Sequence, residues 1–72
     1  MATIQVYRHG SDIKLGKGTG TVDTKNHTAT ITSWTDQAGL SVGTIYKLKS
    51  GGKFYSANCT ANALPVTFDN VE

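Results

Sequence analysis

Cysteine, proline and long apolar stretches are nearly missing from this 72-residue chain, and each scarcity narrows what the protein can be. The single cysteine, Cys59, cannot form an internal disulfide, so the chain is not a small secreted scaffold stapled by disulfides. No apolar run approaches the roughly 18 residues that a membrane-spanning helix needs. The N-terminal residues lack a basic stretch followed by an apolar one, so we expect no signal peptide. The expected location is cytoplasmic, with a place in a larger assembly as the alternative.

Charged residues are also few, because they make up 17% of the chain against 38% hydrophobic and 8% aromatic residues. This composition has too little charge and too many aromatic residues for a disordered chain. A chain of this length has room for one domain with a small core, so residues 1–72 are expected to form a single domain. The net charge of +2 is compatible with a nucleic-acid partner without indicating one.

Residues suited to catalysis or metal binding are sparse. His9 and His27 fall in different predicted turns, and only one cysteine accompanies them, which is short of the three or four close ligands of a metal site. The five carboxylates lie in predicted turns or at the C-terminus: Asp12, Asp23, Asp36, Asp69 and Glu72. Catalysis needs several such groups converging in one pocket. We therefore expect a protein that is not an enzyme, with no catalytic residues, metal, cofactor, small-molecule substrate or membrane partner.

A recurring β pattern is what the chain does contain. β-branched and aromatic residues gather in short segments about every ten positions, separated by Gly, Asn, Asp and Ser. In the first segment, Ile4 and Val6 alternate with polar Gln5 and with Tyr7, so the two aliphatic residues are predicted to face the core and the other two to face away from it. A second strand is predicted to begin at residues 13–15, with its two aliphatic residues, Ile13 and Leu15, facing inward.

Glycine occupies every second position of residues 16–20, whose sequence is Gly-Lys-Gly-Thr-Gly. Glycines inside a strand are typical of a bulge, a barrel corner or a close approach of two backbones. The alternative is a phosphate-cradling loop, which needs a helix to begin directly after it. The following Thr-Val-Asp-Thr-Lys-Asn instead predicts a strand and a turn, so we favour a bend in a barrel strand.

Two hairpins can be aligned from their turns. A two-residue loop at Lys25-Asn26 places apolar positions opposite each other, namely Val22 with Ala29 and Gly20 with Ile31, and a row of threonines on the other face. Gly51-Gly52 suits a type I′ turn. Around that turn the predicted core-facing pairs are Leu48 with Tyr55, Tyr46 with Ala57, and Thr44 with Cys59.

The remaining segments are shorter. Residues 35–39 are predicted to form at most one short helical turn, after which Leu40 and Val42 return to the core. The last strand is predicted over residues 65–68, because proline is tolerated at the start of a strand, and residues 71–72 are expected to fray.

Five or six short strands without a substantial helix predict an all-β fold built from antiparallel hairpins. An open sheet would leave its edges exposed, so a partly closed small barrel or a compact sandwich is favoured, in the size range of SH3-like and OB-like barrels. Such folds carry many unrelated functions, so the fold does not by itself indicate one.

The outer face of the second hairpin is the candidate binding site, because lysines and large apolar residues alternate there with core positions. The candidate binding residues are Ile45, Lys47, Lys49, Lys53 and Phe54, with Trp34, Lys14 and Lys17 as weaker candidates. A purely structural role is the alternative, since lysines on a solvent-facing strand commonly protect it against aggregation.

Two binding functions fit this face. The first expectation is a protein-binding or self-associating module, an accessory subunit or inhibitor, because strand edges pair readily and Ile45 and Phe54 can anchor an interface. The alternative is a module for single-stranded or nonspecific nucleic acid, in which lysines hold the phosphates and an aromatic ring stacks on a base.

Overall fold

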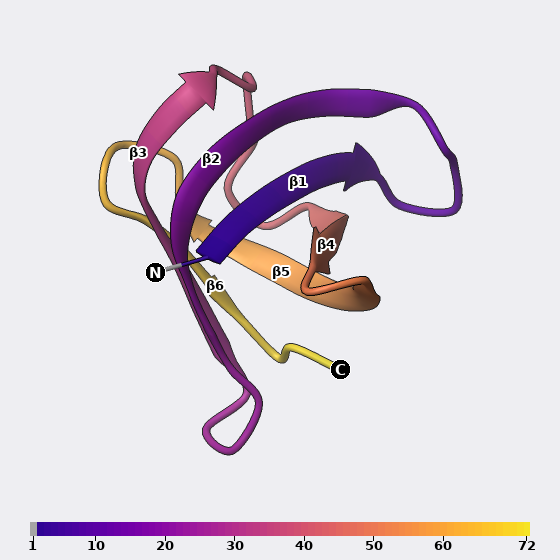
Figure 1. Cartoon of the computed structure of the whole chain (residues 1–72), viewed down its shortest axis with the longest axis vertical. Helices are drawn as coiled ribbons and strands as arrows, with labels where there is room; N and C mark the ends of the chain where they lie inside the picture. The colour runs from indigo at the N-terminus through magenta and orange to yellow at the C-terminus, as the bar shows by residue number, and fades with distance from the viewer. Residues whose placement is uncertain (1) are drawn as a thin grey trace.

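A computed structural model describes residues 2–72, which form six antiparallel strands closed into a barrel (Figure 1). The strands are β1 (Ala2–Arg8), β2 (Lys14–Asp23), β3 (Thr28–Asp36), β4 (Ile45–Ser50), β5 (Lys53–Ala61) and β6 (Val66–Asp69). Around the barrel they follow the order β1-β2-β3-β6-β5-β4, and pairing of β4 with β1 closes the ring. The predicted small all-β fold is confirmed, and of its two alternatives, barrel and sandwich, the structure shows the barrel. No helix among residues 2–72 has the length and apolar character needed to cross a membrane.

The inside of the barrel is filled by one apolar cluster. Ile4 and Val6 are fully buried in it, as their alternation with polar residues predicts. Strands β3 to β6 contribute in the same way, with Ala29, Ile31, Tyr46, Leu48, Ala57, Cys59, Val66 and Phe68. Every buried side chain of the core cluster is hydrophobic. Removal of apolar surface from water is therefore the main stabilising contribution to the fold.

Strand β2 bends strongly around the barrel, and its alternating glycines mark the bend (Figure 1). Gly16, Gly18 and Gly20 face inward, and β3 or the segment after it lies against each of them. At Gly20 the approach is closest, because a Cβ atom there would overlap the carbonyl oxygen of Thr30. Two register shifts between β2 and β3 accompany the bend. The predicted barrel bend is confirmed, and β2 continues to Asp23 without the helix that a phosphate loop requires.

The predicted register of the second hairpin is confirmed, and that of the first is confirmed from Gly20 to Asp23, beyond which a register shift pairs Thr19 with Ser33. The pairs are Val22 with Ala29 and Gly20 with Ile31 in the first hairpin, and Leu48 with Tyr55 and Tyr46 with Ala57 in the second. Thr44 is the exception among the predicted core residues of the second hairpin. Its carbonyl accepts a hydrogen bond from the N–H of Cys59 at 3.0 Å, but its side chain is exposed because Thr44 lies just before β4.

The turn between β2 and β3 has four residues, 24–27, rather than the predicted two. Asp23 organises it, because its carboxylate accepts hydrogen bonds from the backbone N–H groups of Lys25 and Asn26, each at 3.1 Å. The side-chain amide of Asn26 donates to the same carboxylate at 2.8 Å. The Asn26 side chain, followed by the backbone donors, lowers the pKa of Asp23.

Acid titration tests this turn. Because the pKa of Asp23 is lower in the folded chain than in the unfolded one, its stabilising effect is present above the unfolded pKa and is lost as the pH falls through the folded pKa. In Asn26→Ala we expect the pKa of Asp23 to rise toward the ordinary aspartate value of about 3.9. An NMR titration of the side-chain carboxyl measures it. An unchanged pKa would contradict the role assigned to the Asn26 amide.

Two further predicted core placements are wrong, and both lie in connections between strands. Ile13 and Val42, predicted to face the core, are 59% and 58% exposed. Ile13 belongs to the turn before β2, and Val42 lies in the connection before β4, so neither follows the alternation of a strand. Residues 35–39 form no helical turn, because β3 continues through Asp36 and the chain is then irregular.

The C-terminal residues are held in place, contrary to the expectation that they fray. Val71 is buried, and its N–H donates to the carbonyl of His27 at 3.1 Å. Its own carbonyl lies 2.9 Å from Nδ1 of His27, so Nδ1 carries the proton and donates. Glu72 exchanges two backbone hydrogen bonds with Ser56 on β5, at 2.9 and 3.0 Å. The partners are distant in sequence, which is why local pattern could not indicate them.

Candidate functional site

The candidate site lies on the outer surface of four neighbouring strands, β2, β1, β4 and β5. Residues directly opposite each other on adjacent strands point to the same side of a sheet. Two rows of outward-pointing residues therefore cross these strands: Lys14, Tyr7, Lys47 and Ser56 in one row, and Lys17, Gln5, Lys49 and Phe54 in the next. We refer to these eight residues as the lysine–aromatic face.

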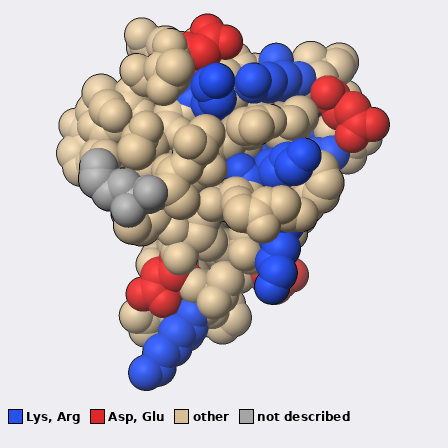
Figure 2. All heavy atoms as spheres, in the orientation of Figure 1, with Lys and Arg blue, Asp and Glu red and all other residues tan. Residues whose placement is uncertain are grey.

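Positive charge is concentrated around this face. The chain has seven Lys and Arg residues, of which four lie in the lysine–aromatic face. Arg8 and Lys53 lie on β1 and β5, whereas Lys25 lies apart in the turn between β2 and β3. Figure 2 shows several basic side chains gathered on the right of the molecule and one projecting from its lower tip. Two carboxylates border the face, since Asp36 pairs with Lys17 and Asp12 contacts Lys47.

Lys47 lies between two aromatic rings. Its Nζ atom is 5.2 Å from the ring centroid of Tyr7 and 4.8 Å from that of Phe54. The Nζ atom of Lys49 is 5.3 Å from the Phe54 centroid. The two rings meet edge to face, with centroids 6.1 Å apart. These cation–π contacts place two ammonium groups beside an aromatic surface that remains accessible, because Phe54 is 53% exposed.

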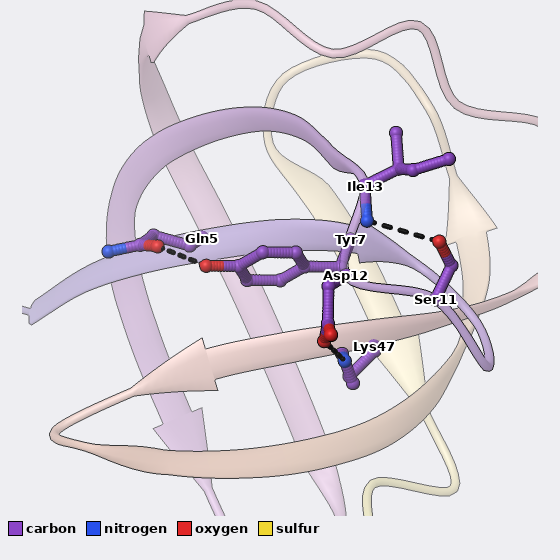
Figure 3. Close-up of polar contacts among 6 residues, drawn as sticks. All are labelled: Gln5, Tyr7, Ser11, Asp12, Ile13 and Lys47. Carbon is purple, nitrogen blue, oxygen red and sulfur yellow. Dashed lines mark hydrogen bonds and ion pairs between the residues drawn. The ribbon is translucent and has the colours of Figure 1, made fainter.

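Polar contacts extend this arrangement to the loop between β1 and β2 (Figure 3). The Tyr7 hydroxyl donates to Oε1 of Gln5 at 2.6 Å. The Nζ atom of Lys47 lies 3.0 Å from Oδ1 of Asp12, and this is the one ion pair among the described residues. The backbone N–H of Ile13 donates to the hydroxyl of Ser11 at 3.1 Å, which shapes the loop that carries Asp12.

Most of the candidate residues come together on one surface. Lys47, Lys49 and Phe54 form its centre, and Lys14 and Lys17 join them from β2 across β1. Ile45 lies farther along β4, opposite Asn58, and is 45% exposed. Lys53 lies opposite Ser50 and lines an open depression of about 450 Å³ together with Tyr55.

Trp34 does not extend the face. It pairs with Gly18 rather than with an outward-pointing residue of β2, and it packs half-buried against the core. A register shift between Thr19 and Gly20 causes the difference, because one extra residue of β3 reverses the side to which the following residues point.

Tyr7 belongs to the lysine–aromatic face but is not among the candidate binding residues predicted from the sequence. Its place on the polar side of the first strand is visible in the alternation of residues 3–8. Its contact with Lys47 depends on the pairing of β1 with β4, which joins distant parts of the chain. No local signal indicates that pairing.

The remaining reactive groups lie elsewhere. Cys59 is buried, and desolvation raises the pKa of its thiol, so the reactive thiolate is disfavoured. His9 and Glu72 line a second open depression of about 380 Å³ beside Ile45. Among residues 2–72 no three His, Cys, Asp or Glu side chains are grouped so that they could hold a metal ion.

In comparisons with known proteins, no protein-family model, no curated protein and no solved structure matches the chain.

Proposed function

We propose that this protein is a non-enzymatic binding module whose lysine–aromatic face binds single-stranded nucleic acid. The observation that carries the proposal is the position of Lys47 between the rings of Tyr7 and Phe54. Surfaces that bind single strands combine cations, which hold the phosphates, with aromatic rings on which bases stack. Three further lysines on the same face supply the additional charges.

The dimensions of the face suit a short stretch of single strand. Neighbouring strands of a sheet lie about 4.8 Å apart, so the four strands span roughly 14 Å. A strand of duplex DNA rises by about 3.4 Å per nucleotide, so a single strand as compact as that would place about four nucleotides across this width. Four lysines are then available for a similar number of phosphates.

A protein partner, the first expectation from the sequence, is the alternative. One argument for a protein partner is that exposed strand edges pair readily with another chain. Closure of the barrel leaves few exposed edges for such pairing. The remaining support is apolar contact through Ile45 and Phe54, which are 45% and 53% exposed. Such an interface would be nearly insensitive to salt, whereas phosphate contacts weaken as salt rises.

Fluorescence anisotropy with labelled single-stranded DNA and RNA of about twelve nucleotides tests the proposal. For four phosphate contacts we expect the affinity to fall by about 50-fold between about 50 and 200 mM salt. Lys49→Glu is expected to weaken binding at least tenfold and to flatten the salt dependence, because a phosphate contact becomes a repulsion.

Lys25→Glu is the matched control, because it makes the same charge change away from the face. We expect it to alter the affinity by less than about twofold. Equal effects of the two substitutions would mean that overall charge, and not this face, binds the oligonucleotide. Absence of binding together with salt-insensitive self-association in sedimentation would instead favour the protein-binding alternative.

A further inference from the structure

We infer that the ammonium group of Lys47 is a phosphate-binding subsite, and that the carboxylate of Asp12 occupies this subsite in the free protein. The inference rests on the proposed function and specifies one contact within it. Asp12 then acts as a built-in competitor that a phosphate group of the ligand displaces.

The surroundings of Lys47 leave it able to bind a further anion. An ammonium group has three N–H donors, and Oδ1 of Asp12, at 3.0 Å, is its one hydrogen-bond acceptor among the described residues. The rings of Tyr7 and Phe54 hold the cation in place but provide no oxygen acceptor at Nζ. The side chain of Lys47 is 21% exposed, so its position is restricted while solvent still reaches it.

Asp12 has the properties of a displaceable occupant. Its side chain is 99% exposed, so packing does not hold it over Lys47. It projects from the loop between β1 and β2 toward Lys47, on the side where Tyr7 lies (Figure 3). Carboxylate and phosphate oxygens are both good acceptors for an ammonium group, so one anion can replace the other. An exposed ion pair contributes little stability, so its loss opposes ligand binding only weakly.

The loop can release Asp12 without unfolding. Its base is closed by backbone hydrogen bonds from the N–H of Arg8 to the carbonyl of Ile13 and from the N–H of Ser11 to the carbonyl of Arg8, both at 3.1 Å. Neither bond involves the Asp12 side chain, so rotation of that side chain frees Lys47 while the backbone of the loop stays in place.

Asp12→Asn removes the competing charge and nearly preserves the shape of the side chain. We expect it to raise the affinity for an oligothymidylate of about twelve nucleotides by about two- to fivefold. We expect the salt dependence to stay nearly the same, because the counterions are released from the phosphates and Lys47 neutralises one phosphate in both proteins. In a Lys47→Gln background the same substitution should have no effect, since the two residues act as a pair.

Asp69→Asn is the matched control, because it removes an equal charge from an exposed residue at the end of β6. It should change the affinity by less than about twofold and leave the slope unchanged. If wild-type protein binds the oligonucleotide but Asp12→Asn leaves the affinity unchanged, the subsite is overturned and the proposed function stands.

A titration with inorganic phosphate tests the Lys47 subsite without nucleic acid. Failure of the subsite can therefore be distinguished from failure of the proposed function. NMR signals of Lys47 and of the Tyr7 ring should respond at lower phosphate concentration in Asp12→Asn than in wild type. Equal responses in the two proteins would overturn the inference, and absence of oligonucleotide binding alone would overturn only the proposed function.

Discussion

Gly20→Ala is expected to destabilise the barrel by about 3 kcal/mol or more, which is a large part of the roughly 4–11 kcal/mol available to a chain of this length. A Cβ atom at this position would overlap the carbonyl oxygen of Thr30 and lie 2.9 Å from Cα of Ile31. These are backbone atoms that cannot rotate away, so β2 and β3 would have to separate. Their separation would disrupt the hydrogen bonds between the two strands.

Gly39→Ala is the matched control for this substitution. A Cβ atom at Gly39 would meet nothing within 4 Å, so we expect a change within about 0.5 kcal/mol. Thermal unfolding followed by circular dichroism measures both variants, and Gly20→Ala should lower the Tm by more than about 12 °C. Equal melting temperatures would contradict the close approach of β2 and β3 at Gly20.

The largest expected effect on binding comes from removing both rings of the lysine–aromatic face. Tyr7→Leu combined with Phe54→Leu is expected to lower the affinity for single-stranded DNA at least about 30-fold, since each stacked base contributes about 1–3 kcal/mol. The salt dependence should stay nearly the same, because every lysine remains. Phe54 is exposed and Tyr7 half-buried on the outer surface, so the fold should survive, which circular dichroism can verify.

Leucine is chosen because it separates stacking from apolar contact. A protein interface centred on Phe54 can accept leucine, whereas a base loses the flat ring on which it stacks. Ile45→Ala is the companion variant, since it trims the other large exposed apolar residue of the hairpin formed by β4 and β5. We expect it to leave oligonucleotide affinity within about twofold. Retained affinity in the double leucine variant would contradict stacking on these rings.

Local pattern predicts much of this barrel because strand alternation and turns are local properties. Ile4 and Val6 are buried as predicted, since residues of a strand alternate between its two sides. The pairing of Leu48 with Tyr55 follows from the position of Gly51-Gly52 alone. Ile13 lies just before β2 begins, so strand alternation does not extend to it. Its predicted burial is therefore wrong.

The candidate site was predictable only in part, because it combines two hairpins. The lysines and Phe54 on β4 and β5 are neighbours within one hairpin, so their shared face is visible in the sequence. Tyr7 joins them through a pairing between distant strands, and Trp34 leaves the outer surface through a register shift. Val71 is buried through hydrogen bonds to a turn far away in the chain. None of these features has a local sequence signal.

Pairing of β1 with β4 also affects how fast the chain folds and when its outer surface is complete. Val6 meets Leu48 across this seam, so chain closure must join segments separated by more than half of the sequence. Small barrels dominated by such non-local pairings fold in roughly milliseconds to seconds, more slowly than helical domains. During synthesis, Tyr7 leaves the ribosome well before Phe54, so the nascent chain cannot present the complete surface. A ligand that binds this surface would therefore bind only the closed barrel and stabilise it against unfolding.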